Sequence, residues 1–465
     1  MANFVGRERE LAQLDESLAG PSPRSVVVVT GTAGIGKTML ALHWAHGVAH
    51  RFPDGQLYAD LRGYAPDEPV PPAQVLARFL RSLGVDTRDM PADADELAAH
   101  YRTALADRRM LVLLDNARDA EQVRPLLPGA GSCHVVVTSR DDLSGLTMAS
   151  GALRVEVGTL PVAVSAKLLG RLLSNRCVHD PAARTAVASR CGGLPLALRL
   201  AAEVATARPG QPLGHLVSQI DGGTGALSTL ECDSVSLRSA FSWSYRSLPA
   251  DAAVAFTLLG LHPGPAVDAY GLAALAGTPL AHAAAQLRVL ARAHLVGSGG
   301  GPRFTLHELV RAYAAELAAE TLPGPDRDQA RSRLLDYYRR AAAVAVNALD
   351  PSGHRRLAVP AATTPVPAFD DPAAARAWLH RERATVIALW SMAADLGLAE
   401  HATDLAQVLW QYVDAQRDDP EPRDPELGEP ELGEPELGEP ELGDPGPGDH
   451  LVPADRPGQP SPGSA

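Results

Sequence analysis

At 465 residues, the chain can hold two or three domains with cores of their own, which excludes a small fold stapled by disulfides. Its four cysteines, Cys133, Cys177, Cys191 and Cys232, lack the paired spacing of zinc sites and redox dithiols, so we interpret them as reduced thiols. The N-terminal segment is charged, and no apolar run reaches the length that spans a bilayer. These features argue against export and membrane insertion and predict a cytoplasmic protein.

The net charge of −13 is concentrated near the C-terminus. Residues 414–449 contain fourteen acidic residues against two arginines, so the rest of the chain is close to neutral. A neutral body lacks the basic excess of proteins that bind nucleic-acid phosphates, so direct DNA binding is not expected. The same region repeats Pro-Glu-Leu-Gly-Glu and contains little to bury, which predicts a disordered tail over residues 414–465.

Short β-branched runs alternate with helical patterns through the first third of the chain. Helices are predicted between most of these runs, as at Ala73–Leu83 and Asp95–Ala106. The predicted strands are Ser25–Thr30, Gln56–Leu61, Met110–Asp115, His134–Ser139 and Leu153–Val157. This alternation is typical of a parallel sheet covered by helices, so residues 1–160 are expected to form an α/β sandwich.

The first strand runs into Gly31-Thr32-Ala33-Gly34-Ile35-Gly36-Lys37-Thr38, and a helix is predicted from Lys37. This is the Walker A pattern of a P-loop, whose backbone N–H groups wrap phosphates where glycines permit the bends. Lys37 supplies a cation for the phosphates and Thr38 a hydroxyl for Mg²⁺. The alternative, a glycine-rich turn without a ligand, does not account for the flanking strand and helix. We therefore expect ATP or ADP with Mg²⁺ at residues 31–38 and the adjoining Met39.

Asp115 ends the apolar strand that starts at Met110. A lone aspartate after a strand is commonly a helix or turn cap. Beside a P-loop, however, a carboxylate at this position completes the magnesium shell. Asn116 follows where many hydrolytic P-loop enzymes have a second acid, and an amide is not a general base. Any hydrolysis is therefore expected to be slow.

Arg140 directly follows the next predicted strand, His134–Ser139. Ligands of open α/β sheets bind at the carboxyl ends of the strands, which places Arg140 within reach of a γ-phosphate. A surface salt bridge is the alternative. With Lys37 and Asp115, Arg140 completes the set of candidate catalytic residues.

The rest of the chain has a predominantly helical pattern. Helices are predicted over Pro161–Ala207, with a break at Gly192–Pro195, and the Gly-rich segment Gly210–Ser228 is predicted to be a linker. Arg288–Val296, Gly297–Gly301 and Phe304–His307 follow the helix, turn and strand order of a winged helix. Amphipathic helices are predicted over Gln329–Leu349 and Pro372–Val413. The predicted domains are a P-loop domain at 1–160, a helical subdomain with linker at 161–228, a winged-helix domain at 229–325, the start of a tetratricopeptide-like helical repeat at 326–413 and the tail at 414–465.

Four motifs in a fixed order resemble the NB-ARC branch of the STAND signalling ATPases, and in particular the nucleotide-switch half of SARP-type bacterial transcriptional regulators. The motifs are Phe4-Val5-Gly6-Arg7-Glu8, Val136-Val137-Thr138-Ser139-Arg140, Gly192-Gly193-Leu194-Pro195-Leu196-Ala197-Leu198 and Phe304-Thr305-Leu306-His307-Glu308. The resemblance implies that Val5 and Gly6 lie against the adenine and that Pro195 packs on the base. It also implies that His307 contacts the β-phosphate of ADP. From the residues alone, Pro195 is a helix breaker and His307 a structural histidine.

The resemblance implies a molecular switch that is closed with ADP and open with ATP, with self-association or a protein partner in the open state. Such regulators begin with a DNA-binding domain, for which the 30 residues before the P-loop leave no room, and end in long repeat arrays, of which only the first helices are predicted here, at Ala374–Val413. Two other functions remain open: a P-loop kinase or transferase acting on a small molecule, and a regulator that binds DNA through the winged helix. For the second, Arg288, Arg292 and Arg303 are the basic residues near the predicted recognition helix and wing.

Overall fold

The computed structural model describes residues 4–19, 25–65, 68–86, 93–129, 133–173, 180–208, 210–221, 225–232, 235–298, 301–349 and 356–418. Most of the predicted disordered tail, from residue 419 onward, lies outside these ranges, as does Cys177. The other three cysteines are free thiols. Within the part of the chain that the structure describes, every helix is too short or too polar to span a bilayer.

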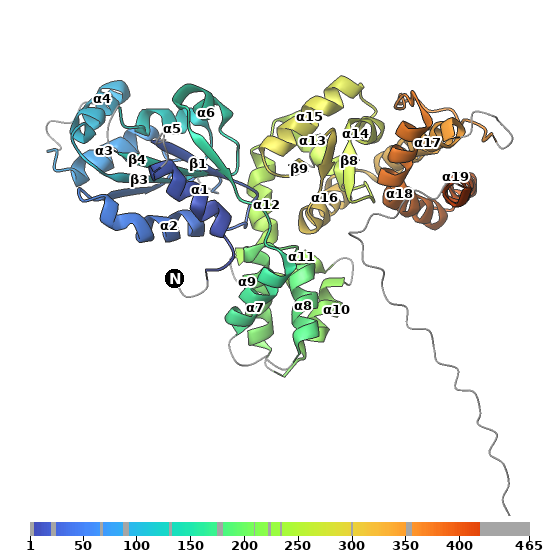
Figure 1. Ribbon diagram of the computed structural model, residues 1–465, viewed down its shortest axis with the longest axis horizontal. Helices are drawn as coiled ribbons and strands as arrows, with labels where there is room; N and C mark the ends of the chain where they lie inside the picture. The colour runs from blue at the N-terminus through green and yellow to red at the C-terminus, as the bar shows by residue number, and fades with distance from the viewer. Residues whose placement is uncertain are drawn as a thin grey trace, which may run out of the picture. The chain divides into compact units, whose positions relative to one another are not determined.

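Five parallel strands form one sheet in the order β2-β3-β4-β1-β5 (Figure 1). They are β1 (Val26–Thr30), β2 (Gln56–Asp60), β3 (Leu111–Ala117), β4 (His134–Ser139) and β5 (Leu153–Glu156). All five predicted strands are therefore present. β1 consists of four consecutive Val residues and Thr30, and all five are buried, as is usual in a parallel sheet covered on two sides.

Alternate residues of β1 face two different cores. Val27 and Val29 pack toward α1 (Glu8–Ala19) and α2 (Lys37–Val48), whereas Val26 and Val28 pack with α3 and α4. The helices of the second face are α3 (Pro72–Ser82), α4 (Ala94–Leu105), α5 (Ala120–Val123) and α6 (Ser144–Ser150). This three-layer sandwich is the α/β architecture that the sequence predicts.

The helical region after the sheet contains α7 (Val162–Leu173), α8 (Pro181–Arg190), α9 (Pro195–Ala207), α10 (Leu213–Asp221) and α11 (Ala226–Thr229). The prediction of a linker over Gly210–Ser228 is wrong, because α10 and α11 occupy much of it. Leu213, Leu216 and Ile220 are spaced by three and four residues and are buried on one face of α10. That apolar face outweighs the local glycines.

A second, antiparallel sheet with the order β8-β10-β9 lies further along the chain. Helix α15 ends at Arg292, before the predicted end at Val296, and β9 lies within the turn predicted at Gly297–Gly301. The predicted last strand is shorter than expected, because β10 ends at Thr305 and His307 is the N-cap of α16. The elements are β6 (Glu231–Cys232), β7 (Val235–Ser236), α12 (Leu237–Arg246), α13 (Ala250–Leu259), β8 (Ala266–Asp268), α14 (Ala269–Ala276), α15 (Leu280–Arg292), β9 (Gly297–Ser298), β10 (Arg303–Thr305) and α16 (Glu308–Thr321).

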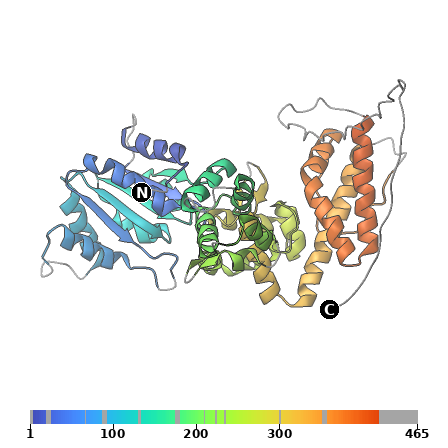
Figure 2. The ribbon, with the colours of Figure 1, turned by 90° about the horizontal axis from the view of Figure 1, so that it is seen from below.

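Three long helices close the described chain and pack side by side, drawn in orange to red in Figure 2. They are α17 (Gly324–Leu349), α18 (Pro372–Asp395) and α19 (Ala399–Asp418). Gly397, in the left-handed conformation, separates α18 from α19 within the single helical stretch predicted at Pro372–Val413. Because α19 continues to Asp418, the boundary predicted between helix and disordered tail at residue 414 is too early.

Candidate nucleotide-binding site

The loop between β1 and α2 has the backbone that a phosphate cradle requires. Gly31, Gly34 and Gly36 have φ values of +145°, +76° and +96°. A Cβ at Gly31 would lie 2.7 Å from the carbonyl oxygen of Val157, so glycine is needed there for space as well as for conformation. Helix α2 begins at Lys37, so its free N–H groups point into the loop, as in anion sites at helix N-termini. Thr32, Ala33 and Ile35 complete the predicted loop.

Lys37 is buried at the centre of this loop. Its ammonium donates to the carbonyl oxygens of Gly31 at 2.8 Å and Thr32 at 2.9 Å. Burial and the nearby Arg140 lower the pKa of Lys37 to about 7, against the opposing effect of Asp115. Two of its three N–H groups are thus used to orient the side chain, and the remaining donor suits an anion in the cradle.

Asp115 and Thr38 lie side by side, although they are far apart in sequence. The Thr38 hydroxyl donates to Oδ1 of Asp115 at 2.8 Å. Thr138, in β4, donates to the same oxygen at 2.5 Å, and the Tyr58 hydroxyl donates to Oδ2 at 3.4 Å. Burial and Asp115 together raise the pKa of Tyr58 to about 12, so it remains a donor at neutral pH. The structure therefore brings the two predicted metal ligands together and adds two residues that orient them.

Asn116 occupies a backbone conformation that is uncommon for a residue with a side chain. Its φ is +58°, and the pairing of β3 with β4 shifts in register between Leu114 and Ala117. Asparagine tolerates this left-handed conformation better than most residues do. Its N–H donates to Oγ1 of Thr138 at 2.9 Å, and its carbonyl accepts from Gly63 at 2.7 Å. The bulge at the end of β3 is thus held from both neighbouring segments.

The side chain of Arg140 is held by α12. One guanidinium nitrogen donates to the carbonyl oxygen of Ala240 at 2.6 Å and to Oγ of Ser244 at 3.1 Å. The guanidinium also lies over the rings of Tyr64 and Trp243, at 5.0 and 5.8 Å from their centroids. Burial lowers the pKa of Arg140 to about 10. The alternative of an exposed salt bridge does not describe this environment.

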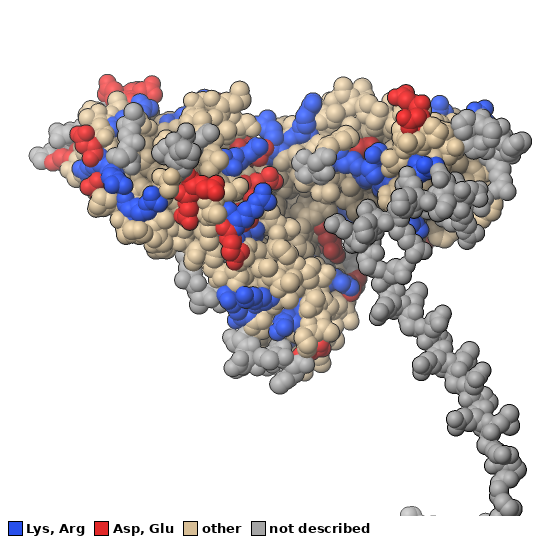
Figure 3. All heavy atoms as spheres, in the orientation of Figure 1, with Lys and Arg blue, Asp and Glu red and all other residues tan. Residues whose placement is uncertain are grey.

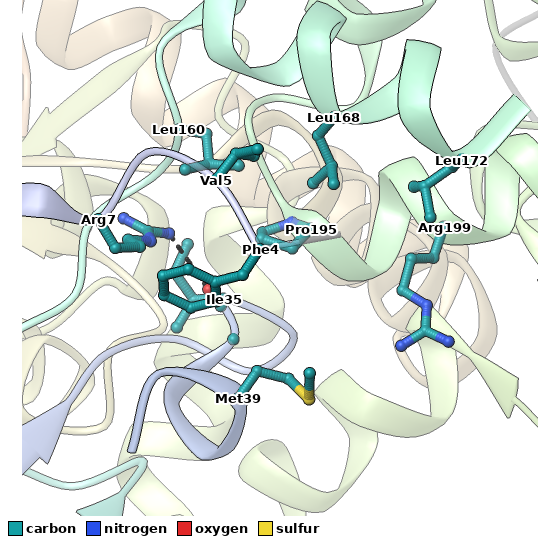
Figure 4. A pocket seen from close by; sticks show the side chains of 11 residues that line it. Phe4, Val5, Arg7, Ile35, Met39, Leu160, Leu168, Leu172, Pro195 and Arg199 are labelled. Atoms are coloured by element: carbon teal, nitrogen blue, oxygen red, sulfur yellow. Dashed lines mark hydrogen bonds between the residues drawn. The ribbon is translucent and has the colours of Figure 1, made fainter. Parts of the chain in front are cut away.

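A cavity of about 280 Å³ lies beside the loop and is mostly apolar. Five of the residues predicted to bind the nucleotide line it: Val5, Ile35, Gly36, Met39 and Pro195. In Figure 4, Phe4 comes from the N-terminal segment, Ile35 from the loop and Met39 from α2, whereas Leu168, Leu172 and Arg199 come from α7 and α9. Apolar walls with few polar groups are typical of a site for a flat ring.

Gly6 has a packing role next to this cavity. Its φ is +66°, and a Cβ there would lie 2.3 Å from Cγ1 of Val164 in α7. The following residue, Arg7, donates to the carbonyl oxygen of Ile35 at 3.2 Å and pairs with Glu10. Residues 4–7 are thereby fixed against both the loop and α7, which positions Val5 at the cavity.

The Gly-Gly-Leu-Pro turn, residues 192–195, contacts the loop on one side and His307 on the other. Leu196 donates its N–H to the carbonyl oxygen of Gly34 at 3.1 Å. His307 lies 2.7 Å from the carbonyl oxygen of Gly192 through Nε2, while its Nδ1 accepts the N–H of Leu309 at 3.1 Å. Nε2 must therefore carry the proton in this arrangement. Burial lowers the pKa of His307, which keeps the ring neutral.

Several residues of this site were not predicted. Thr138 lies in β4, one residue before the strand ends at Ser139, and its position next to Asp115 depends on the pairing of β4 with β3. No local pattern points to Tyr58, whose contact with Asp115 depends on the pairing of β2 with β3. Leu168, Leu172 and Arg199 come from helices whose approach to the loop is a tertiary feature.

Comparison with known proteins identifies the N-terminal region. A family model described as the AAA ATPase domain matches residues 3–207. These residues are an AAA ATPase domain. The regulatory proteins AfsR of Streptomyces griseus and Streptomyces coelicolor are 37% and 36% identical to the chain over 409 and 424 residues, which is 87% and 88% of its length. The chain is therefore homologous to these regulators and spans 41% and 42% of their lengths.

The chain also has relatives among plant proteins. A probable disease resistance RPP8-like protein 2 of Arabidopsis thaliana is 26% identical over 209 residues, 43% of this chain and 22% of its own. Together with the AfsR proteins, this relative confirms the predicted resemblance to STAND ATPases and SARP-type regulators.

Solved structures were also compared. The Walker-type ATPase of Pyrococcus abyssi is 14% identical, with a TM-score of 0.44, over 67% of this chain and 96% of its own. A STAND protein with a tetratricopeptide repeat sensor from Pyrococcus horikoshii is 18% identical, with a TM-score of 0.31, over 90% of this chain and 62% of its own. The fold assignment itself comes from the sheet topology given above.

Proposed function

We propose that the chain is an adenine-nucleotide switch of the STAND type that acts in bacterial signalling or transcriptional regulation. ADP would favour a closed state and ATP an open one that associates with itself or with a protein partner. The observation that carries this proposal is the 2.8 Å contact between Thr38 and Asp115 next to the buried Lys37. A cation, a hydroxyl and a carboxylate at one cradle are what a magnesium nucleotide requires.

The proposed nucleotide would place its phosphates in the cradle at residues 31–38 and its base in the cavity lined by Val5, Met39 and Pro195. Mg²⁺ would be held by Thr38 and Asp115. Both offer oxygen ligands, and Mg²⁺ commonly takes one or two protein oxygens together with phosphate oxygens and waters. No cluster of three or more acidic, His or Cys ligands was found within the described residues, which fits a metal that arrives with its nucleotide. When bound, the ion would neutralise charge on the phosphates.

The proposed closed state would depend on contacts made by Arg140 and His307. Arg140 donates to α12 through Ala240 and Ser244, and His307 contacts Gly192 at the turn that touches the loop. A γ-phosphate would compete with α12 for the Arg140 guanidinium, whereas the β-phosphate of ADP would remain near His307. Shifting a population from 1:99 to 99:1 requires about 5.5 kcal/mol, and a few charge-assisted hydrogen bonds are of that order.

Direct DNA reading by the winged-helix region is the weaker candidate. Arg303 pairs with Glu382 at 3.2 Å and is mostly buried, so it is engaged within the chain. The end of α15 is engaged as well, since the carbonyl oxygen of Arg292 accepts the N–H of Asp142 at 3.2 Å. On the face drawn in Figure 3, basic and acidic residues are interspersed over the described part, without a broad basic surface.

The test is the nucleotide dependence of the molecular mass in solution. We expect the wild-type protein with Mg²⁺ to be monomeric in ADP and to associate in a non-hydrolysable ATP analogue, as measured by light scattering after gel filtration. Arg140→Ala should bind both nucleotides and lose the difference between them. Arg190→Ala, which removes an exposed arginine paired with Asp221, is the matched control and should behave as wild type. Equal mass in both nucleotides for the wild type would contradict the switch.

A further inference from the structure

Thr138 is a buried hydroxyl in a strand otherwise made of valines at its centre. It is 1% exposed in β4. Its Oγ1 accepts the N–H of Asn116 at 2.9 Å and donates to Oδ1 of Asp115 at 2.5 Å. A hydroxyl has one proton to give and lone pairs to accept with, so the two bonds are compatible and together fix the direction of the proton.

The need for this hydroxyl follows from the bulge at the end of β3. The register shift between Leu114 and Ala117, with Asn116 at a φ of +58°, interrupts the regular pairing with β4. Thr138 gives the Asn116 N–H an acceptor at this interruption, which a buried amide requires. The same atom then reaches the carboxylate one residue earlier, so the bulge and the side chain of Asp115 are fixed together.

The Asp115 carboxylate is thus held from two sides. Thr138 and Thr38 both donate to Oδ1, but Thr38 is itself a proposed magnesium ligand. A bound ion would occupy a lone pair of the Thr38 hydroxyl and leave its proton free to donate, so Thr38 would move with the ion, whereas Thr138 supports the carboxylate from the sheet. Residues that hydrogen-bond metal-binding carboxylates typically change metal affinity by about 10- to 100-fold when removed.

We propose that Thr138 is a positioning residue of the magnesium centre: it orients the Asp115 carboxylate and sets the gain in nucleotide affinity that Mg²⁺ provides. This inference rests on the proposed function. It adds a residue that acts through Asp115 and does not itself contact the nucleotide.

The experiment compares the affinity for fluorescent ADP in Mg²⁺ with the affinity in EDTA, and takes the ratio for each variant. Thr138→Val keeps the shape and removes the hydroxyl, and it should reduce the ratio by about tenfold or more while changing the EDTA value little. Thr138→Ser restores the hydroxyl and should recover most of the ratio. Asp115→Asn should lower the ratio in the same direction.

Thr30→Val is the matched control. Thr30 is a buried threonine in the adjacent strand β1 whose hydroxyl has no hydrogen-bond partner within the described residues. Thr30→Val should leave the ratio of the Mg²⁺ and EDTA affinities unchanged. If Thr138→Val lowers both affinities equally, or keeps the wild-type ratio, Thr138 is structural and the inference is wrong. If Thr138→Val does not fold, the affinity ratio of Thr138→Ser is compared with that of Thr30→Val. A Thr138→Ser ratio well below the Thr30→Val ratio would show that the hydroxyl does not restore the effect of Mg²⁺, and would contradict the inference. A wild-type protein that binds no ADP would instead contradict the proposed function.

Discussion

Two buried polar clusters in this chain differ in how their charges are satisfied. The proposed magnesium centre contains Lys37, Thr38 and Asp115, and it lies beside a cavity and the glycine-rich loop of residues 31–38. The second cluster, which we name the C-terminal joint, consists of Arg303, Glu382, Tyr338 and His262, and it connects the β8-β10-β9 sheet to α17 and α18. The joint meets its hydrogen-bonding needs largely within the protein, whereas the centre offers donors to a ligand.

The joint is a compact ion pair with added hydrogen bonds. Nη2 of Arg303 lies 3.2 Å from Glu382, whose side chain is 3% exposed. Tyr338 donates to Glu382 at 3.3 Å and lies 3.4 Å from Nε2 of His262. Burial raises the pKa of Glu382, against the lowering effect of Arg303, and burial lowers the pKa of His262 to about 4. A neutral His262 and a paired Glu382 indicate stability as the role of the joint.

The largest effect is expected from breaking the joint. Glu382→Ala would leave Arg303 without its partner, and losing one member of a buried pair costs about 3 to 5 kcal/mol. The free energy of unfolding, measured by urea titration, should fall by about this amount. Asp221→Ala is the control, because it breaks an exposed pair with Arg190 that is worth about 0 to 1 kcal/mol. If both variants lose the same free energy of unfolding, the buried pair of the joint contributes no more to stability than the exposed pair.

A smaller change is expected at the magnesium centre from Asn116→Asp. The new carboxylate can act as a general base toward water, and aspartate tolerates the left-handed backbone of this position. Phosphate release from ATP should rise by about tenfold or more, with folding retained. Asn116→Ala lacks the base and should stay as slow as wild type. If both variants hydrolyse ATP equally, Asn116 does not limit the rate.

The smallest effect concerns the pH dependence of the joint. Because the folded-state pKa of Glu382 lies above its ordinary value of 4.5, the folded protein binds more protons than the unfolded chain between those two values. Its contribution to stability therefore decreases as pH rises through that window. Glu382→Gln should remove this slope from a series of unfolding curves collected upward from pH about 4. If Glu382→Gln leaves the dependence of the unfolding free energy on pH unchanged, other titrating groups cause that dependence.

The sequence is sufficient to predict that Thr38 and Asp115 lie together, whereas their role as magnesium ligands remains a prediction. Asp115 lies near the carboxyl end of β3, Arg140 follows β4, and Lys37 begins the helix after β1, so the parallel topology brings these residues to one edge of the sheet. The sequence around Arg140 does not predict the hydrogen-bond partner of its side chain, because that partner lies in α12, about a hundred residues further along the chain. The role of His307 as a phosphate contact remains a prediction.

The joint is not predictable in the same way. In the sequence, Arg303 resembles a basic residue of a DNA-binding wing, and Glu382 resembles a solvent-exposed charged residue of a helix. Their pairing depends on how α18 packs on the sheet, which no local periodicity encodes. Helix α10 is different, because the spacing of Leu213, Leu216 and Ile220 does indicate a helix. The neighbouring glycines favour a linker instead, and this is why the helix is not predicted.

The central claim is that Lys37 and Asp115 form one magnesium–nucleotide site. The most direct measurement is the equilibrium binding of fluorescent ADP with Mg²⁺ to Lys37→Ala and to Lys167→Ala, which alter the two lysines of the chain. Lys167 is exposed in α7, so its variant should bind as tightly as wild type. Lys37→Ala should show no saturable binding. Retained ADP affinity in Lys37→Ala, with a folded protein, would contradict the account.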